Sequence, residues 1–282
     1  MAAQTLDHSA ENVKPSRIGT ASLFFSIHAA TLAVFFVPFR WGLVGWLVGS
    51  YLVRMFGVTA GYHRYFSHRT YKLNRVNQFL MAFLAETSGQ KGILWWAAHH
   101  RDHHRHSDEL LDVHSPWQKT FWWAHLGWIL SDEYEAYNPR RIADFGRFPE
   151  LRWLDRYFLI PIIVYGAAIF AVGGWGAFVW GFLLSSVLLY HGTFAINSFA
   201  HIFGRRRFDT PDQSRNNWLL ALLTLGEGWH NNHHFSEGSC RQGLRWWEID
   251  LTYYALRMLS LLGIARDIRS FRIPPQARQD AA

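Results

Sequence analysis

Residues 99 to 106 read His-His-Arg-Asp-His-His-Arg-His, which places five histidines within eight positions. If this segment is helical, each residue turns by about 100° around the axis, so His100, His103 and His104 fall within an arc of roughly 100°. Three imidazoles on one helix face can converge on one point and bind a metal ion there. The segment therefore predicts a helix that carries metal ligands.

The same H-x-x-H-H spacing returns in His230-Asn-Asn-His-His, and a wider pair occurs in His63-Arg-Tyr-Phe-Ser-His. A low-complexity surface tract, or a set of solvated imidazoles, would also be rich in histidine. Such a tract would not repeat one spacing in an unrelated apolar context much later in the chain. The repetition therefore favours a metal centre built from three boxes.

The apolar residues, which make up 50% of the chain, are gathered in stretches about long enough to cross a bilayer. These stretches are Ser22 to Phe39, Gly42 to Ala60, Tyr157 to Val172 and Ala177 to Ile196. They form two pairs, because only short links at 38–41 and 173–176 separate their members. We therefore predict an all-α integral membrane protein with four transmembrane helices in two hairpins.

Charge indicates the orientation of these hairpins. Arg40 is the one cation in the two links, whereas lysines and arginines are frequent in the flanking segments. The positive-inside bias then places both termini and all three boxes on the cytoplasmic side, in a helical cap. We expect residues 1–282 to form a single domain with disordered tails at 1–17 and 274–282. The net charge of +7 is accounted for by the same bias, and no binding motif for nucleic acid accompanies it.

Several further residues are candidates near the boxes. Asn197 and His201 lie at i and i+4 at the end of the fourth stretch, so His201 becomes a ninth ligand candidate. Glu227 and Asp112 are the carboxylates best placed to accept an imidazole N–H and fix its tautomer. We expect structural roles for His28 and His191. His114 and His125 could be ligands, but neither has a partner at metal-ligand spacing, so we expect them to support a ligand from outside or to be structural.

The donor set limits the metal. Zinc takes four ligands, and the H-E-x-x-H motif is absent from the chain. A ferritin-like site would need two E-x-x-H pairs, whereas the chain has one clear pair. A single cysteine, Cys240, excludes an iron–sulfur cluster held by this chain. Nine imidazoles suit two metal ions with four or five ligands each, and a redox-active metal with imidazole ligands indicates iron and O₂. A site at the membrane surface above apolar helices favours a lipid chain as substrate.

The three boxes resemble those of membrane fatty acyl desaturases of the stearoyl-CoA Δ9 type. They read His63-Arg-Tyr-Phe-Ser-His68, His100-Arg-Asp-His-His104 and His230-Asn-Asn-His-His234. Segments between the boxes are similar too, namely Thr59-Ala-Gly-Tyr, Asp112-Val-His-Ser-Pro, His125-Leu-Gly-Trp, Asn197-Ser-Phe-Ala-His and Gly226-Glu-Gly-Trp. The similarity extends from about Tyr51 to Ile268.

This resemblance implies an oxidoreductase that inserts a cis double bond into a saturated long-chain acyl group with O₂ and two external electrons. It implies two non-haem iron ions held by His63, His68, His100, His103, His104, His201, His230, His233 and His234, with Asn197 holding a water on one iron. The third box begins with histidine, not with the glutamine typical of front-end desaturases, which favours the Δ9 branch. The Leu94-Trp-Trp-Ala-Ala segment is similar to bacterial and plastid-type members, so we expect a bacterial inner membrane.

The sequence lacks two cofactor signatures, and their absence bears on the source of the electrons. No His-Pro-Gly-Gly cytochrome b5 signature and no Rossmann glycine fingerprint occur, so a separate donor such as a ferredoxin, a rubredoxin or a cytochrome b5-like protein is expected. The acyl carrier stays open between coenzyme A, acyl carrier protein and an intact glycerolipid. A di-iron lipid hydroxylase or alkane monooxygenase shares the three-box chemistry and is the alternative function. A membrane metal transporter is a remote alternative, because it would need more polar ligands at mid-membrane.

A substrate tunnel is predicted from the face of the second stretch below His63. Tyr51 and Met55 share that face, about 18 Å and 12 Å below the metal level at 1.5 Å per residue. That depth is comparable with the methyl-side half of a long acyl chain, so both residues are candidates for a tunnel floor. Ordinary helix packing is the alternative for such bulky residues.

Overall fold

The computed structural model describes residues 19–270. Both tails predicted to be disordered, 1–17 and 274–282, lie outside the described residues. Within residues 19–270 the chain forms helices and isolated β-bridges but no strand. The prediction of an all-α protein is therefore confirmed for the described residues.

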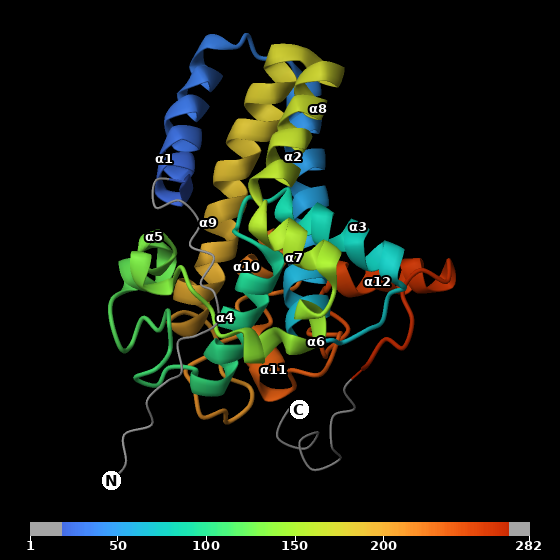
Figure 1. Ribbon diagram of the computed structural model, residues 1–282. Coiled ribbons are helices and arrows are strands. Elements are labelled where there is room, and N and C mark those ends of the chain that lie inside the picture. The colour runs from blue at the N-terminus through green and yellow to red at the C-terminus, as the bar shows by residue number, and fades with distance from the viewer. Residues whose placement is uncertain (1–18, 271–282) are drawn as a thin grey trace.

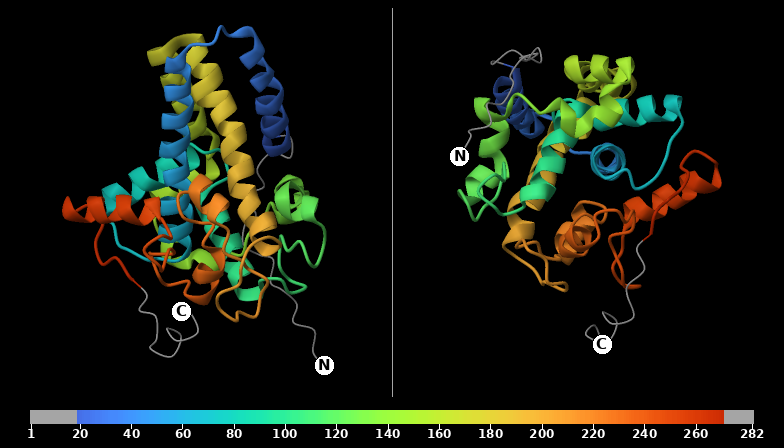
Figure 2. Two further views of the ribbon diagram at one scale, coloured as in Figure 1. Left: turned by 180° about the vertical axis from the view of Figure 1, so that it is seen from behind. Right: turned by 60° about the horizontal axis from the view of Figure 1, so that its bottom comes forward.

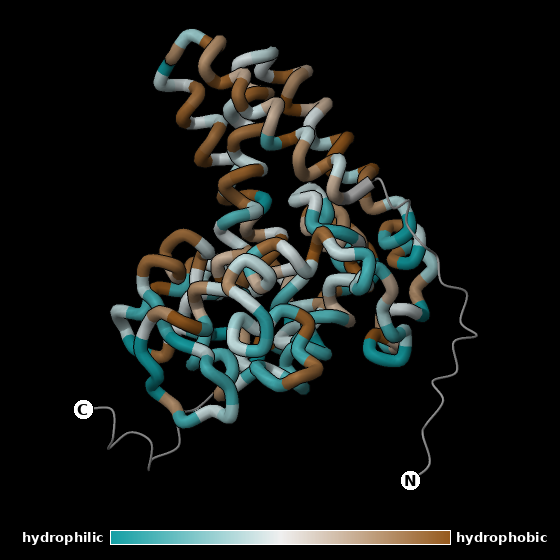
Figure 3. Tube along the Cα trace, turned by 90° about the vertical axis from the view of Figure 1, so that its left-hand side faces the viewer, coloured by the Kyte–Doolittle hydropathy of each residue, from teal (hydrophilic) through white to brown (hydrophobic). Residues whose placement is uncertain are grey.

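Four apolar helices lie side by side and extend away from the rest of the molecule (Figures 1 and 2). They are α1 (Gly19–Thr31), α2 (Trp41–Phe56), α8 (Leu159–Ala177) and α9 (Ser185–Ser198). Short helical segments continue them: η1 (Leu32–Phe36) after α1, η2 (Gly57–Ser67) after α2, and η6 (Phe178–Leu184) between α8 and α9. Figure 3 shows this bundle as mainly hydrophobic, while the remainder of the chain is mixed.

Two helical segments are long and apolar enough to cross a membrane, Trp41–Ser67 and Leu159–His201. The second contains Gly174 in the left-handed region at φ 68°, a conformation that glycine adopts without a steric penalty. The chain turns back near this residue, so the 43-residue helix comprises the third and fourth predicted stretches. The first predicted stretch is a shorter apolar helix, Ala21–Phe36.

A buried arginine joins the two hairpins. Arg54 of α2 is fully buried, and its guanidinium donates hydrogen bonds of 2.7 Å to the hydroxyls of both Ser185 and Ser186. The sequence places Arg54 on the helix face opposite His63, where it either reaches the membrane surface or pairs with a neighbour. The structure shows the pairing, which holds α2 against α9.

The remaining helices form a cap at one end of the bundle (Figure 2). They are α3 (Arg75–Glu86), α4 (Ile93–His106), α5 (Trp128–Leu130), α6 (Ala143–Gly146), α7 (Pro149–Arg156), α10 (Trp218–Leu223), α11 (His230–Phe235) and α12 (Leu251–Leu261). Shorter segments among them are η3 (Trp123–Gly127), η4 (Asp132–Tyr134), η5 (Pro139–Ile142) and η7 (Phe199–His201). On α12, Met258 and Leu261 are 68% and 84% exposed.

A buried and a half-buried carboxylate fix the start of α4, the helix that carries the central box. Glu86 accepts a hydrogen bond from the backbone N–H of Ile93 at 2.9 Å. Asp155 of α7 accepts from Leu94 and Trp95 at 2.8 and 2.9 Å. Gly92 precedes the helix and leaves room for this carboxylate, because a Cβ at position 92 would lie 2.2 Å from an Asp155 carboxylate oxygen. Side chains from α3 and α7 thus satisfy the free N–H groups of α4 where no local cap exists.

Candidate metal centre

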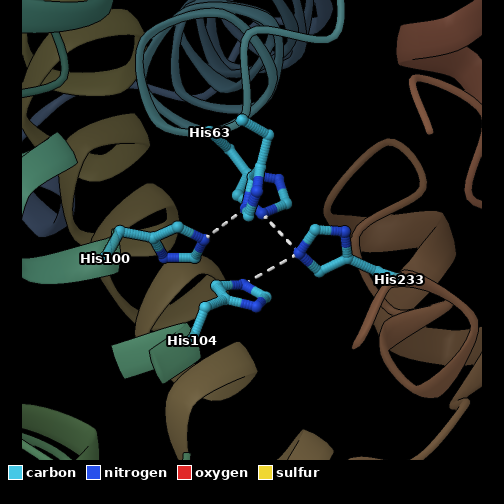
Figure 4. A group of neighbouring side chains, drawn as sticks. His63, His100, His104 and His233 are labelled. Carbon is cyan, nitrogen blue, oxygen red and sulfur yellow. Dashed lines mark hydrogen bonds between the residues drawn. The ribbon is translucent and has the colours of Figure 1, made fainter. Parts of the chain in front are cut away.

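The nine predicted histidines lie in two adjacent groups at the end of the bundle. The first group comprises His63, His68, His100, His104 and His233, and the second comprises His103, His201, His230 and His234. Within each group the facing ring nitrogens all lie within 4.8 Å of one another. Figure 4 shows His63 of η2, His100 and His104 of α4, and His233 of α11 pointing toward a common centre.

The two H-x-x-H-H boxes divide between the groups by helical geometry. His100 and His104 of α4, at i and i+4, enter the first group, while His103 enters the second. In α11 the i,i+4 pair His230 and His234 enters the second group and His233 the first. Convergence of His100, His103 and His104 on one point, expected from the sequence, is therefore wrong: His103 is about 100° from His104 around the helix and reaches the other group.

The wider first box is explained by a π-helical segment. All residues of η2 are buried, and the backbone N–H of His68 donates to the carbonyl of His63 at 3.2 Å. This i→i+5 hydrogen bond widens the turn, so residues five apart come onto one face. The ring centroids of His63 and His68 lie 4.7 Å apart as a result. An α-helix would separate these two side chains by about 140°.

Carboxylates face the outer ring nitrogen, Nδ1, of five of these histidines. The pairs are His63–Glu227 at 2.6 Å, His103–Asp112 at 3.0 Å, His104–Glu237 at 3.1 Å, His201–Asp108 at 2.9 Å and His234–Asp212 at 2.8 Å. Glu227 and Asp112 thus lie where the sequence predicted an imidazole partner. The sequence analysis missed Asp108, Asp212 and Glu237, for which only nearness to a box was a signal.

These contacts keep Asp112 and Glu227 ionised although both are buried. Burial alone would raise the pKa of Asp112, but attraction by His103 and His114 outweighs it and lowers that pKa below its usual range. Burial likewise opposes ionisation of Glu227, yet His63 and Arg64 lower its pKa to about 2. Arg64 is itself 1% exposed, and its guanidinium lies 3.0 Å from Glu227 and 2.9 Å from Asp250.

Burial favours the neutral form of five of these imidazoles, the form that can bind a cation through a ring nitrogen. Burial and the neighbouring imidazoles lower the pKa values of His68, His100, His104, His230 and His233 well below the usual value. A carboxylate on Nδ1 holds the proton there and leaves a lone pair on Nε2. The Nε2 atoms of His63 and His233 face each other at 3.0 Å, as do those of His201 and His230.

This donor arrangement fits two metal ions. The Nε2 atom of His234 is buried without a hydrogen-bond partner among the described residues, as expected for a ligand that faces a cation. Imidazole donors without an inner carboxylate suit a first-row transition metal better than Mg²⁺ or Ca²⁺. The residues present therefore match the two-ion expectation of four and five ligands.

A narrow, mainly apolar cavity adjoins the first group between α1, α4, α5 and α9. Its wall includes Leu23, Phe24, Gln90, Lys91, Trp95, Trp96, His100, His114, Trp128, Tyr190, Thr193, Phe194 and Asn197. Asn197 thus lies on the wall that His100 also lines.

Tyr51 and Met55 are not part of this wall. Their side chains face Gly192 of α9, and the Tyr51 hydroxyl donates to the carbonyl of Leu223 at 2.7 Å.

The histidines without metal-ligand spacing have mostly structural contacts. His28 and His191 face each other with ring nitrogens 3.2 Å apart, and His191 and His125 do so at 2.9 Å. His125 also contacts the Ser198 hydroxyl at 2.9 Å. His114 differs, because it lies in a third possible metal-holding group with His103 and Asp112.

Fold and site together define an all-helical protein with two long apolar helices and a buried double cluster of imidazoles beside an apolar cavity. A family model described as fatty acid desaturase matches residues 40–260. The chain belongs to the fatty acid desaturase family and is an oxidoreductase of lipid metabolism.

Relatives with described activities are similar along most of the chain. An sn-2 palmitoyl-lipid 9-desaturase of Nostoc sp. (strain 36) is 38% identical, with 90% of each chain covered. An sn-1 stearoyl-lipid 9-desaturase of Anabaena variabilis is 36% identical over 92% of this chain and 97% of its own length. An acyl-CoA C20 Delta5-desaturase of Anemone leveillei is 37% identical over 76% of this chain and 70% of its own.

Proposed function

We propose that this protein is an O₂-dependent acyl-lipid desaturase that introduces a cis double bond at position 9 of a saturated long-chain acyl group. The observation that carries the proposal is the division of nine buried or half-buried histidines into groups of five and four beside an apolar cavity. The similarity to two acyl-lipid 9-desaturases supports both the position and the glycerolipid carrier. An acyl-CoA substrate is the alternative carrier, supported by the third relative.

The nine histidines are proposed to hold two non-haem iron ions, and Asn197 to hold a water on one of them. When bound, the iron pair supplies the activation of O₂ that removal of hydrogen from an unactivated C–H bond requires. The chain's own residues hold the acyl group in place, because only its position relative to the site decides which carbons react. Aromatic side chains of the cavity wall, including Trp95, Trp96 and Trp128, exclude water from that place.

The topology is proposed to comprise four membrane spans in two hairpins, with the cap and both termini in the cytoplasm. The long helix with its reversal at Gly174 supports one hairpin, and Ala21–Phe36 followed by Trp41–Ser67 supports the other. The short links between the spans carry few charges, whereas the cap carries many arginines. We propose a bacterial inner membrane as the location and residues 1–282 as one domain.

Two electrons are proposed to come from a separate ferredoxin, rubredoxin or cytochrome b5-like protein, since the chain carries no cofactor fingerprint of its own. A di-iron hydroxylase acting on the same lipids would need the same histidines. The two reactions differ in their product, because a hydroxylase leaves an alcohol where a desaturase leaves an alkene.

Expression of the full chain in a bacterial host that lacks desaturases tests the proposal. We expect about two iron atoms per chain and a new cis double bond at position 9 of membrane glycerolipids, located by mass spectrometry. A His103→Ala variant serves as the matched control, because it loses one proposed ligand and keeps the apolar helices. A hydroxylated product, or an unchanged lipid profile with full iron occupancy, would contradict the proposal.

A further inference from the structure

The carboxylates around the two histidine groups are distributed unevenly. In the second group, three of the four imidazoles have a carboxylate oxygen between 2.8 and 3.0 Å from Nδ1. In the first group, two of the five imidazoles have such a partner, Glu227 at 2.6 Å and Glu237 at 3.1 Å. The second group therefore has fewer imidazoles but more carboxylates behind them.

The three carboxylates of the second group are buried and have no lysine or arginine beside them. The side chains of Asp108, Asp112 and Asp212 are 6%, 0% and 5% exposed. Among residues 19–270, no lysine or arginine forms an ion pair with any of the three. They accept hydrogen bonds from hydroxyls and backbone N–H groups instead. Neutral donors lower the cost of burying a charge but leave the charge in place, so three negative charges adjoin the second group.

The first group differs in burial and in charge. Glu227 is buried, but the Arg64 guanidinium lies 3.0 Å from it and 2.9 Å from Asp250, so two carboxylates share one cation. These three groups together leave one negative charge. The side chain of Glu237 is 47% exposed, and water and salt screen a charge at such a position. The buried charge is therefore smaller beside the first group than beside the second.

We propose that the second group is the tighter of the two metal sites and fills first, and that Asp108, Asp112 and Asp212 determine this order. The inference rests on the proposed pair of metal ions. Each buried carboxylate attracts a divalent cation, and the attraction is strong where water is excluded. The cation also supplies the positive charge that buried carboxylates require.

The number of imidazoles opposes this order, because the first group offers five and the second offers four. A fifth imidazole is a neutral donor that takes the place of a water molecule, so it does not change the charge of the site. A carboxylate behind a ligand is worth about 10- to 100-fold in metal affinity. The second group has more buried partners of this kind, so we expect the effect of charge to exceed that of the fifth imidazole.

Stepwise loading of the metal-free full chain in nanodiscs tests the order. Fe²⁺ is added without O₂, and calorimetry follows the two binding steps. We expect the wild-type protein to bind one ion about 10-fold or more tightly than the other. His230→Ala, which removes a ligand of the second group, should abolish the tighter step and keep the weaker one. His68→Ala, which removes a ligand of the first group, should keep the tighter step and abolish the weaker one.

Variants that remove charge identify the cause of the order. Asp212→Asn keeps an acceptor oxygen for His234 but carries no charge, so it should weaken the tighter step by about 10- to 100-fold and spare the weaker one. Asp108→Asn should act in the same way through His201. Glu237→Gln is the matched control, because it removes a carboxylate that contacts a ligand of the first group and should leave the tighter step unchanged. The thermal midpoint establishes that each variant is folded.

Several outcomes would overturn the inference. Two steps of equal affinity would do so, and so would a tighter step that persists in His230→Ala and disappears in His68→Ala. An unchanged tighter step in folded Asp108→Asn and Asp212→Asn would show that the carboxylates do not set the order.

Failure of the proposed function would give a different result. A wild-type chain that makes no alkene contradicts the desaturase proposal and does not alter the metal titration. A wild-type chain that binds one ion contradicts the proposed pair, and the two histidine variants then show which group holds that ion. Binding that survives His68→Ala supports the inference, whereas binding that survives His230→Ala overturns it.

Discussion

Single residues decide whether each metal group is complete. His103 and His233 are the members of the two H-x-x-H-H boxes that cross to the other group, and both are about 2% exposed. We expect His103→Ala and His233→Ala to abolish product formation because an imidazole that no neighbour can replace is lost. Iron analysis and lipid profiling check this. His106→Ala is the control, because His106 belongs to neither group and contacts Glu109 at the surface. Near-native turnover and iron content in either box variant would contradict the ligand assignment.

Glu227 contacts the first histidine group through His63. Its carboxylate accepts the Nδ1 proton of His63 at 2.6 Å and is held in turn by Arg64 and Gln242. We expect Glu227→Gln to lower iron affinity or activity by about 10- to 100-fold, since loss of such a partner disturbs the tautomer and orientation of the ligand. A metal titration measures the affinity. Glu237→Gln should have a smaller effect because Glu237 is half-exposed and contacts His104 less closely. Equal, wild-type affinity in both variants would assign Glu227 to packing alone.

Tyr51 and Met55 test the depth of the acyl site. Both face Gly192, and the next residue, Thr193, lines the cavity. Neither residue lines the described cavity, so we propose that the acyl chain extends beyond it until its methyl end stops against them. Tyr51→Ala and Met55→Ala should then shift the preference to longer chains. A ladder of acyl lengths, compared with the exposed Leu52→Ala as control, measures the preference. An unchanged profile with lower thermal stability would leave helix packing as their role.

At the scale of the element, α4 depends on a carboxylate from α7. Burial raises the pKa of Asp155 to about 6, although hydrogen bonds from Trp95, Tyr137 and Leu94 oppose the shift. A folded-state pKa above the unfolded value of about 3.9 means that the folded protein binds the proton more tightly. The stability from this proton is therefore complete below about pH 4 and is lost as pH rises through about 6.

We expect Asp155→Asn to remove this part of the pH dependence, since the amide keeps an acceptor oxygen for Leu94 and Trp95 but does not titrate. Thermal unfolding in detergent between pH 4 and 6 should show a smaller loss with rising pH than in the wild-type protein. Other carboxylates titrate equally in both proteins, so the difference between the two curves reports Asp155. Parallel curves would show that Asp155 has an ordinary pKa.

At the scale of the whole molecule, the proposed topology predicts which positions can be labelled from each side of the membrane. The one cysteine, Cys240, is fully buried and should not react. Arg40→Cys and Trp175→Cys, at the two links, should react with an impermeant maleimide from outside intact cells. Arg147→Cys, in the cap, should react only after lysis. Labelling of Arg147→Cys in intact cells would contradict a cytoplasmic cap.

The family membership, the helical class and the identity of the nine clustered histidines are accessible from the sequence. They depend on local patterns: the spacing of the boxes, the length of the apolar stretches and the glycine-rich link at 173–176. Such patterns are periodic within one helix, so the helix geometry alone makes them interpretable. The division of the nine histidines between two groups could not be predicted in this way. Helix geometry suggested that the three histidines on α4 converge on one point, whereas the structure separates His103 from His100 and His104.

Tertiary contacts decided the rest. The π-helical turn that aligns His63 with His68 depends on packing of η2 against α3 and α4. Asp108 and Asp212 reach His201 and His234 from segments that are 93 and 22 residues away in sequence. The burial of Lys91, which lies beside the cavity and is 4% exposed, is also a result of the tertiary fold. Long-range packing creates the desolvation that makes these charged groups depend on one another, and desolvation has no signature in a local sequence pattern.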